Sequence, residues 1–264
     1  MASFQLDVLP LDVRVVSDVI CPWCYLGTER LSKALQLLQK EFPTQISISQ
    51  RWIPYLLNPG LSSEKIVSKR RMYEKKFNGD LFKVKKMERS IAKLYLAEGL
   101  PKYTLDGNCG STLNAHRLME LVKDVGLQTQ LMNVLFRKYH TEGKSPSVQK
   151  HLIDSAIEAG LKKSKEELIE FLESNEKLNE VAGFLQTNTH VFPMLSGVPH
   201  FRFSCPSKED KTMLIHSVIP GAQDLDTFIL SLSNFLTRAG YETEVKAFKT
   251  TISNDTLCNF NSKI

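Results

Sequence analysis

The hydrophobic pattern of the first sixty residues predicts a strand, a helix and a second strand. A run rich in β-branched valines at residues 13–16 predicts a strand over residues 12–20. Over residues 26–42, apolar side chains recur three and four positions apart, which is the period of an amphipathic helix. Residues 46–52 alternate between apolar and polar, as a half-buried strand does. This order predicts a βαβ unit with parallel strands and a right-handed crossover.

The pattern changes to a helical period after residue 60. From residue 62 to 190, apolar residues recur three and four apart in several segments that glycine-containing breaks separate. Strand patterns return at 198–203 and 213–218, and a helix is predicted at 225–236 with Asp224 as its N-cap. The last three segments complete the sheet begun at residue 12.

These patterns predict an α/β protein with a discontinuous first domain. Residues 11–60 and 191–240 are expected to form this domain. Residues 61–190 are expected to form an inserted all-helical domain. Residues 241–264 are expected to be a polar, irregular C-terminal tail.

Composition is that of an ordinary globular chain. Of 264 residues, 42% are apolar and 24% charged, and the formal charge is only +5. Basic residues are dense over 65–89, where we favour a solvated helical face over a docking surface for an acidic protein. Over the chain as a whole the basic residues are spread out and match no known nucleic-acid-binding motif, so no nucleic-acid partner is expected.

Localisation is expected to be cytoplasmic. Residues 1–10 lack a basic segment followed by an apolar one, and no apolar run approaches membrane-spanning length, so no membrane partner is expected. The final Ser262-Lys263-Ile264 is similar to a peroxisomal Ser-Lys-Leu address. We favour a frayed polar end over that address, since a tripeptide match is weak.

The main chemical motif is Cys21-Pro22-Trp23-Cys24, at the junction of the first strand and the first helix. Two cysteines at this spacing can close into a disulfide and reopen. Unpaired N–H groups and the dipole at a helix start favour a thiolate, which lowers the pKa of the first cysteine. Cys21 is therefore predicted to be the exposed nucleophile and Cys24 the resolving thiol, with Pro22 tolerated in the first turn.

The cysteine pair could have two other roles. A zinc site needs a second Cys or His pair at short spacing, whereas Cys109, Cys205 and Cys258 are isolated, so no metal is expected. The pair could also be two inert buried thiols. Cys109 and Cys205 themselves are expected to be buried small hydrophobes.

A second feature is Gly197-Val198-Pro199, which opens a predicted strand. Proline at a strand start is a common boundary without any function. A cis Val198–Pro199 bond would leave the neighbouring backbone free to pair with a thiol-bearing peptide. Val198 and Pro199 are therefore candidate substrate-binding residues.

Three further side chains are candidates near the dithiol. Trp23 is expected to be an exposed aromatic platform that binds substrate. Asp18 could relay a proton, although a turn-stabilising role is favoured. His116 is expected to be a hydrogen-bonded core histidine rather than a catalytic base.

Several stretches together resemble the DsbA-type thioredoxin-fold oxidoreductases, specifically their FrnE-like branch. They are Val16 to Gly27, Arg51 to Pro59, Ala115 to Leu118, Ser196 to Pro199 and Pro220 to Gln223. The resemblance covers residues 12–238. It implies a thioredoxin-like fold interrupted by a helical domain, exchange chemistry at Cys21 and Cys24, and a cis Pro199 facing them.

The expected function is thiol–disulfide exchange through a mixed disulfide, on a thiol- or disulfide-bearing protein or small molecule. Related 2-hydroxychromene-2-carboxylate isomerases and kappa-class glutathione transferases generally carry serine at the position of Cys21. The cysteine pair retained here therefore favours redox chemistry. The alternatives are a glutathione-dependent transferase or isomerase, and a binding or chaperone-like module. No bound cofactor is expected, and glutathione is a candidate cosubstrate or reductant. The sequence is compatible with a monomer and with a homodimer.

Overall fold

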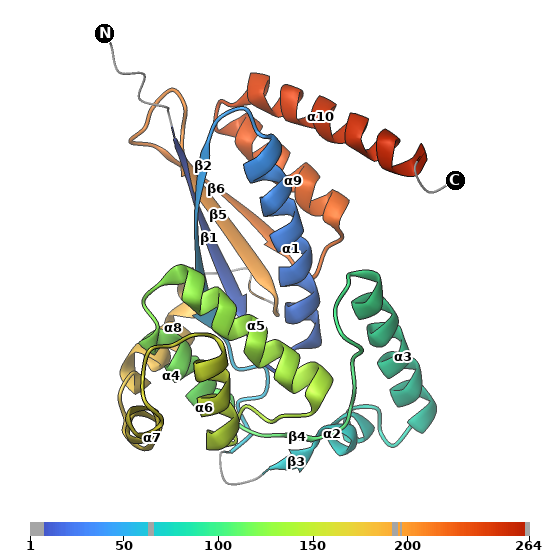
Figure 1. The fold of residues 1–264 in the computed structure, drawn as a ribbon, viewed down its shortest axis with the longest axis vertical. Helices are drawn as coiled ribbons and strands as arrows, with labels where there is room; N and C mark the ends of the chain where they lie inside the picture. The colour runs from blue at the N-terminus through green and yellow to red at the C-terminus, as the bar shows by residue number, and fades with distance from the viewer. Residues whose placement is uncertain (1–7, 63–65, 192–194, 196, 262–264) are drawn as a thin grey trace. The chain divides into compact units, whose positions relative to one another are not determined.

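Figure 1 shows the fold of the chain in a computed structural model, which describes residues 8–62, 66–191, 195 and 197–261. The C-terminal Ser262-Lys263-Ile264, similar to a peroxisomal address, lies outside these residues. The elements are β1 (Leu9–Ser17), α1 (Pro22–Glu41), β2 (Ile46–Pro54), β3 (Val67–Ser68), α2 (Lys69–Lys76), α3 (Leu81–Ala97), β4 (Asn108–Cys109), α4 (Leu113–Leu121), α5 (Val125–Glu142), α6 (Gln149–Glu158), α7 (Lys165–Glu173), α8 (Leu178–Val191), β5 (His200–Pro206), β6 (Leu214–Pro220), α9 (Leu225–Arg238) and α10 (Glu242–Asn261).

The main sheet has four strands in the order β2-β1-β5-β6. Near their starts, β1 and β2 are joined by a 2.8 Å bond from the Leu9 N–H to the Gln45 carbonyl. Beyond their ends, the Tyr55 N–H donates to the Ser17 carbonyl at 3.0 Å. Because start pairs with start and end with end, β1 and β2 are parallel, which confirms the predicted βαβ unit. Helix α1 begins at Pro22, four residues earlier than predicted, because proline fits the first helical position.

The chain divides into two compact units by its internal contacts. Unit 1 comprises residues 1–14, 27–50 and 201–264, and unit 2 comprises residues 15–26 and 51–200. This division differs from the expected domain boundaries, because it places the cysteine segment with the helical block. The reason is local bonding within unit 2, where Tyr95 on α3 and His140 on α5 both hydrogen-bond to the backbone of residues 19–22.

In unit 1, helix α9 packs against the strands that precede it. The ring of Phe228 lies 5.2 Å from that of Phe201, and Phe235 lies against Phe203. Asp224 caps the helix as predicted, since its carboxylate accepts the Thr227 N–H at 2.7 Å.

Helix α10 corrects the expectation of an irregular tail over residues 241–264. Tyr241, Val245 and Phe248 are each at most 3% exposed, and they repeat at helical spacing. The rings of Tyr241 and Phe248 lie 6.5 and 6.1 Å from that of Phe42. The segment is mostly polar, so its composition did not indicate a packed helix. Three apolar residues at helical spacing are enough to pack this helix against the rest of unit 1.

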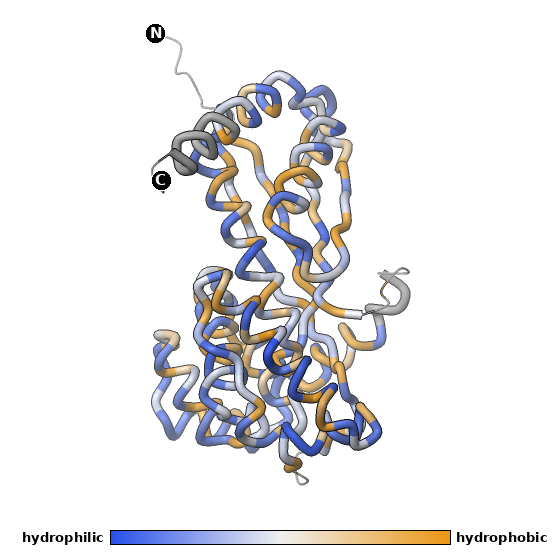
Figure 2. The backbone as a smooth tube through the Cα atoms, turned by 90° about the vertical axis from the view of Figure 1, so that its right-hand side faces the viewer, coloured by the Kyte–Doolittle hydropathy of each residue, from blue (hydrophilic) through white to orange (hydrophobic). Residues whose placement is uncertain are grey.

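Unit 2 contains α2 to α8. Figure 2 shows hydrophilic and hydrophobic residues following one another along the helical parts of the chain, as amphipathic helices require. The insert is not entirely helical. Strands β3 and β4 form a short antiparallel ribbon that pairs Val67 with Cys109 and Ser68 with Asn108. Two-residue strands leave too little periodicity for the sequence to reveal them. Within the described part of the chain, none of the helices has the length and apolar character needed to cross a bilayer.

A buried arginine joins α4 to the end of α7. Arg117 is only 4% exposed, and its guanidinium donates to the backbone carbonyls of Phe171, Leu172 and Ser174 at 2.6–3.3 Å. It donates further to the Glu176 carbonyl and to the side chain of Asn114. The carbonyls at a helix end have no partner within the helix, so Arg117 acts as a side-chain cap for α7.

Candidate active site

The cysteine motif occupies the start of α1, as predicted. Cys21 directly precedes the helix, and a tight turn places it there, since its N–H donates to the Asp18 carbonyl at 3.0 Å. The Cys24 N–H donates to the Cys21 carbonyl at 3.1 Å, which puts the two cysteines one turn apart. Both are free thiols. This arrangement offers a dithiol at the positive end of a helix dipole.

Exposure of the motif differs from the prediction in one respect. Trp23 is 43% exposed, as expected for an aromatic platform, and Cys24 is fully buried. Cys21 is only 2% exposed, so the expectation of an exposed nucleophile is wrong. The cause is the Val198 segment, whose carbonyl oxygen lies 3.6 Å from the Cys21 sulfur and accepts its S–H.

The Val198-Pro199 segment reaches the dithiol from 177 positions further along the chain. Its peptide bond is cis, as the sequence resemblance implies. Val198 is half-buried and packs against an apolar cluster that contains Val16 of β1 and Ile53 of β2. The two sequence features singled out as chemical therefore meet at one site.

The two sulfurs have different surroundings. Burial raises the pKa of Cys24 well above its ordinary value, and the hydrogen bond and charge of Cys21 raise it further. The Ser17 hydroxyl and the Asp18 backbone N–H act in the opposite direction on this pKa, but more weakly. Cys24 is therefore a protonated thiol at neutral pH, which leaves Cys21 as the sulfur available for attack.

Asp18 and His116 lie together behind the motif. Asp18 is fully buried, and its carboxylate accepts the Leu57 N–H at 2.7 Å and the Ile20 N–H at 3.4 Å. His116 is 2% exposed, with Nε2 3.0 Å from the Tyr55 carbonyl and 3.6 Å from the Asp18 carboxylate. These bonds are those of a turn-stabilising aspartate and a core histidine, the roles favoured from sequence. A proton relay through Asp18 stays a prediction.

Sequence reasoning missed two residues that hold the motif from the helical block. The buried Tyr95 hydroxyl donates to the Pro22 carbonyl at 2.8 Å, between the two cysteines. The His140 Nε2 donates to the Val19 carbonyl at 2.9 Å. Both sit on the buried faces of ordinary amphipathic helices, so their spacing carried no signal of this role.

His140 predicts a pH-dependent stability. Burial, and then the nearby charge of Lys69, hold the pKa of His140 well below its ordinary value of 6.5. Below pH 6.5 the unfolded chain therefore binds a proton at His140 that the folded chain does not. The contribution of neutral His140 to the free energy of unfolding is complete above pH 6.5. It is lost as the pH falls below 6.5, by up to about 1.4 kcal/mol per pH unit.

Urea unfolding of the wild type and of His140→Gln at pH 7.5, 6.5 and 5.5 measures this loss. Glutamine keeps an N–H donor but does not titrate, so the variant should show a shallower decline between pH 6.5 and 5.5. Equal declines in the two proteins would show that another group is responsible.

A pocket of about 530 Å³ has Ile20, the residue before Cys21, in its wall. Leu57, Met72 and Tyr73 make it largely apolar, and Lys75 and Lys76 add positive charge. Such a pocket suits a ligand with an apolar part and an acidic group. Among the described residues, no group of three or more His, Cys, Asp or Glu side chains could hold a metal ion.

Several solved structures have a fold similar to that of this chain. A probable DsbA oxidoreductase from Streptomyces coelicolor is 25% identical, with a TM-score of 0.70 over 86% of this chain and 90% of that one. A 2-hydroxychromene-2-carboxylate isomerase is 14% identical, with a TM-score of 0.54 over 88% of this chain and 97% of its own. The cytosolic disulfide reductase DsbM from Pseudomonas aeruginosa is 15% identical, with a TM-score of 0.52 over 86% and 98%. The last two share the fold alone.

No curated protein matches the sequence. The family model described as DSBA-like thioredoxin domain matches residues 12–232, which include the cysteine motif, the helical insert and the Val198-Pro199 segment. With the four-stranded sheet and the dithiol at the start of α1, this match establishes that the chain belongs to the DSBA-like thioredoxin-domain family.

Proposed function

We propose that this protein is a thiol–disulfide oxidoreductase in which Cys21 is the nucleophile and Cys24 the resolving thiol. The observation that carries the proposal is the asymmetry of the dithiol. Cys24 is fully buried and protonated, while the Cys21 sulfur lies at the helix start beside the Val198 carbonyl. Family membership supports this chemistry, as does the similarity to a probable DsbA oxidoreductase.

The reaction starts when the Cys21 thiolate attacks one sulfur of a substrate disulfide. The substrate S–S bond breaks, one substrate thiolate leaves and takes up a proton, and a Cys21–substrate mixed disulfide forms. Cys24 then gives up its proton and attacks the Cys21 sulfur. The second substrate thiol leaves, and two electrons have passed from the dithiol to the substrate. The reverse sequence oxidises a substrate dithiol.

Substrate binding is proposed on both sides of Cys21. The Val198 carbonyl, which accepts the Cys21 S–H in the reduced protein, is placed to accept an N–H from an extended substrate backbone instead. Exposed Trp23 offers apolar surface beside the sulfur. The pocket that starts at Ile20 would take a neighbouring substrate side chain, with Lys75 and Lys76 favouring an acidic one.

A redox titration in glutathione buffers, read by alkylation and mass spectrometry, tests the proposal. We expect one reversible two-electron transition in which Cys21 and Cys24 lose their reactivity together. A Cys109→Ser, Cys205→Ser double variant is the control, because burial raises the pKa of both these thiols and they should not take part. Cys21 and Cys24 that stay reduced across all buffers would refute an exchange function.

A glutathione-dependent transferase or isomerase is the second candidate. The lysine-flanked pocket beside Cys21 favours it, because glutathione is a thiol that carries two carboxylates. In this mechanism Cys21 would orient the glutathione thiolate, and Cys24 would have no role. Cys24→Ser should then retain most turnover with glutathione and an aromatic electrophile, whereas the exchange mechanism predicts that it loses disulfide turnover.

A further inference from the structure

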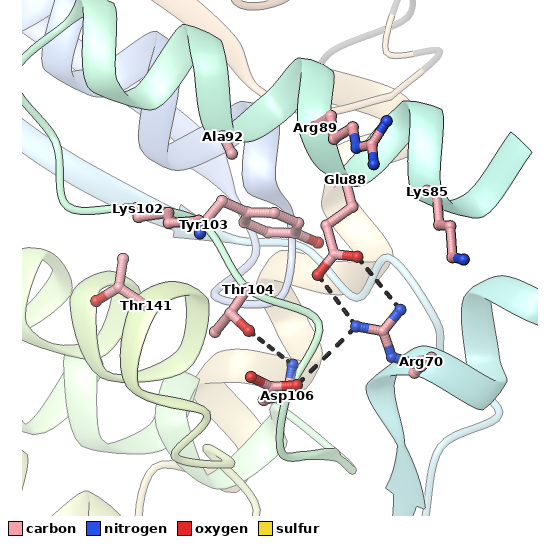
Figure 3. A pocket seen from close by; sticks show the side chains of 10 residues that line it. All are labelled: Arg70, Lys85, Glu88, Arg89, Ala92, Lys102, Tyr103, Thr104, Asp106 and Thr141. Atoms are coloured by element: carbon pink, nitrogen blue, oxygen red, sulfur yellow. Dashed lines mark hydrogen bonds and ion pairs between the residues drawn. The ribbon is translucent and has the colours of Figure 1, made fainter. Parts of the chain in front are cut away.

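A second pocket, of about 650 Å³, lies in unit 2, and the cysteine motif is not part of its lining (Figure 3). Its walls come from four segments, namely α2, α3, the loop of residues 102–106 and the end of α5. Residues 85, 88, 89 and 92 of α3 line it, and this spacing places them on one face of the helix. The volume lies within the range of about 300–1,000 Å³ that is usual for small-molecule sites.

The two acidic side chains of this pocket both interact with Arg70. Glu88 accepts two hydrogen bonds from the Arg70 guanidinium, each of 3.2 Å, and a third from the Leu105 N–H at 3.1 Å. Asp106 lies 4.0 Å from the same guanidinium. Figure 3 shows this group as one connected wall of the pocket. One guanidinium offsets only one of these two carboxylates, so Glu88, Asp106 and Arg70 together carry one negative charge, which is fewer than the positive charges elsewhere around the pocket.

Three cations remain around the pocket. Lys85 and Arg89 line it from α3, and Lys102 lines it from the loop on another side (Figure 3). All three are exposed, and none forms an ion pair with any residue that the structure describes. Cations on two sides of one recess leave a positive potential that an anion with separate charged groups would neutralise.

A fourth cation lies behind the pocket wall. Lys69 is fully buried, and its ammonium donates to the carbonyl of Thr104, a lining residue, at 2.8 Å and to that of Tyr139 at 2.9 Å. Its Nζ also lies 4.4 Å from the centre of the Tyr139 ring. Burial lowers the pKa of Lys69 to about 8, so the group is still mostly charged at pH 7. The pocket thus has positive charge at its rim and behind its wall.

We propose that this pocket binds a small anion that carries two or more carboxylate or phosphate groups. The recess is closed by four segments and sized for a small molecule, which favours such a ligand over an acidic protein segment lying across the surface. The proposal is independent of the chemistry at Cys21. The charged groups of the ligand would lie between the α3 cations and Lys102.

Calorimetric titration of the full chain at low ionic strength, with citrate and with pyrophosphate in separate experiments, tests the proposal. We expect one-to-one binding of at least one of them, and the pair distinguishes a carboxylate from a phosphate ligand. Arg89→Ala and Lys102→Ala should each weaken the affinity at least about tenfold, as expected for loss of a charge-assisted contact. Circular dichroism verifies folding, which these exposed positions should not disturb.

The matched control is Lys86→Ala, which removes an exposed charge from α3 outside the pocket. This variant should keep its affinity within about twofold. Three results would overturn the proposal: neither anion binds, Lys86→Ala weakens binding as much as Arg89→Ala, or only a hexaglutamate peptide binds. The last would identify the surface as a docking site for acidic protein segments instead.

Discussion

We expect Cys21→Ser to lower the rate of insulin-disulfide reduction at least about 1,000-fold, because no other described thiol can replace it in the proposed mechanism. Cys24 is one turn away, but burial raises its pKa well above the ordinary value, so it is protonated at neutral pH. Burial also raises the pKa of Cys109 and Cys205, which are therefore poor nucleophiles at neutral pH. A serine hydroxyl at position 21 is a far weaker nucleophile toward sulfur than a thiolate.

Cys24→Ser is expected to fail at a different step. Cys21 still attacks, but nothing resolves the intermediate, so a mixed disulfide with the substrate accumulates and a reductant releases it. Non-reducing electrophoresis and mass spectrometry should detect this adduct in Cys24→Ser and not in Cys21→Ser. Cys109→Ser serves as the control and should turn over at the wild-type rate. Normal turnover by Cys21→Ser, or an adduct on Cys21→Ser, would contradict the assigned roles.

Arg117→Ala is expected to lower the free energy of unfolding by about 3 kcal/mol or more. The guanidinium satisfies four backbone carbonyls at and beyond the end of α7, and the ring of Phe171 lies 5.1 Å from its central carbon. Alanine leaves buried acceptors without donors, and each costs about 1–3 kcal/mol. It also leaves a cavity where the side chain was.

Denaturant unfolding followed by circular dichroism measures the loss. Arg117→Lys is the matched variant, since it keeps the charge but has fewer donors, and it should fall between alanine and the wild type. Arg71→Ala, which removes an exposed arginine from α2, should change the stability by less than about 0.5 kcal/mol. Equal stabilities of Arg117→Ala and Arg71→Ala would show that the hydrogen bonds of Arg117 to the end of α7 do not stabilise the protein.

The elements of the sheet could be predicted because their signals are local. The βαβ order, the motif at the start of α1 and the Asp224 cap each depend on neighbouring residues, and the structure confirms them. The meeting of Cys21 with Val198 is not a local property. It was expected from the family resemblance, since no periodicity relates residues 177 positions apart.

The features that the sequence did not predict have a common physical cause. The burial of Cys21, the Tyr95 bond to the Pro22 carbonyl and the Arg117 cap all depend on tertiary packing. A tyrosine or arginine on a helical stripe looks the same in sequence whether it packs passively or bonds a distant carbonyl. The same holds for the basic residues of α3. Their spacing in the sequence predicts that they share one face of the helix, but it does not predict the pocket beside that face.

Helix α10 also bears on how the protein can be shortened for expression. The family match ends at residue 232, inside α9, so a recombinant fragment guided by it would be cut after α9, at Arg238. Such a fragment would strip Tyr241 and Phe248 from the ring of Phe42 and expose it to solvent. A fragment intended to stay monodisperse should therefore extend at least through Phe248.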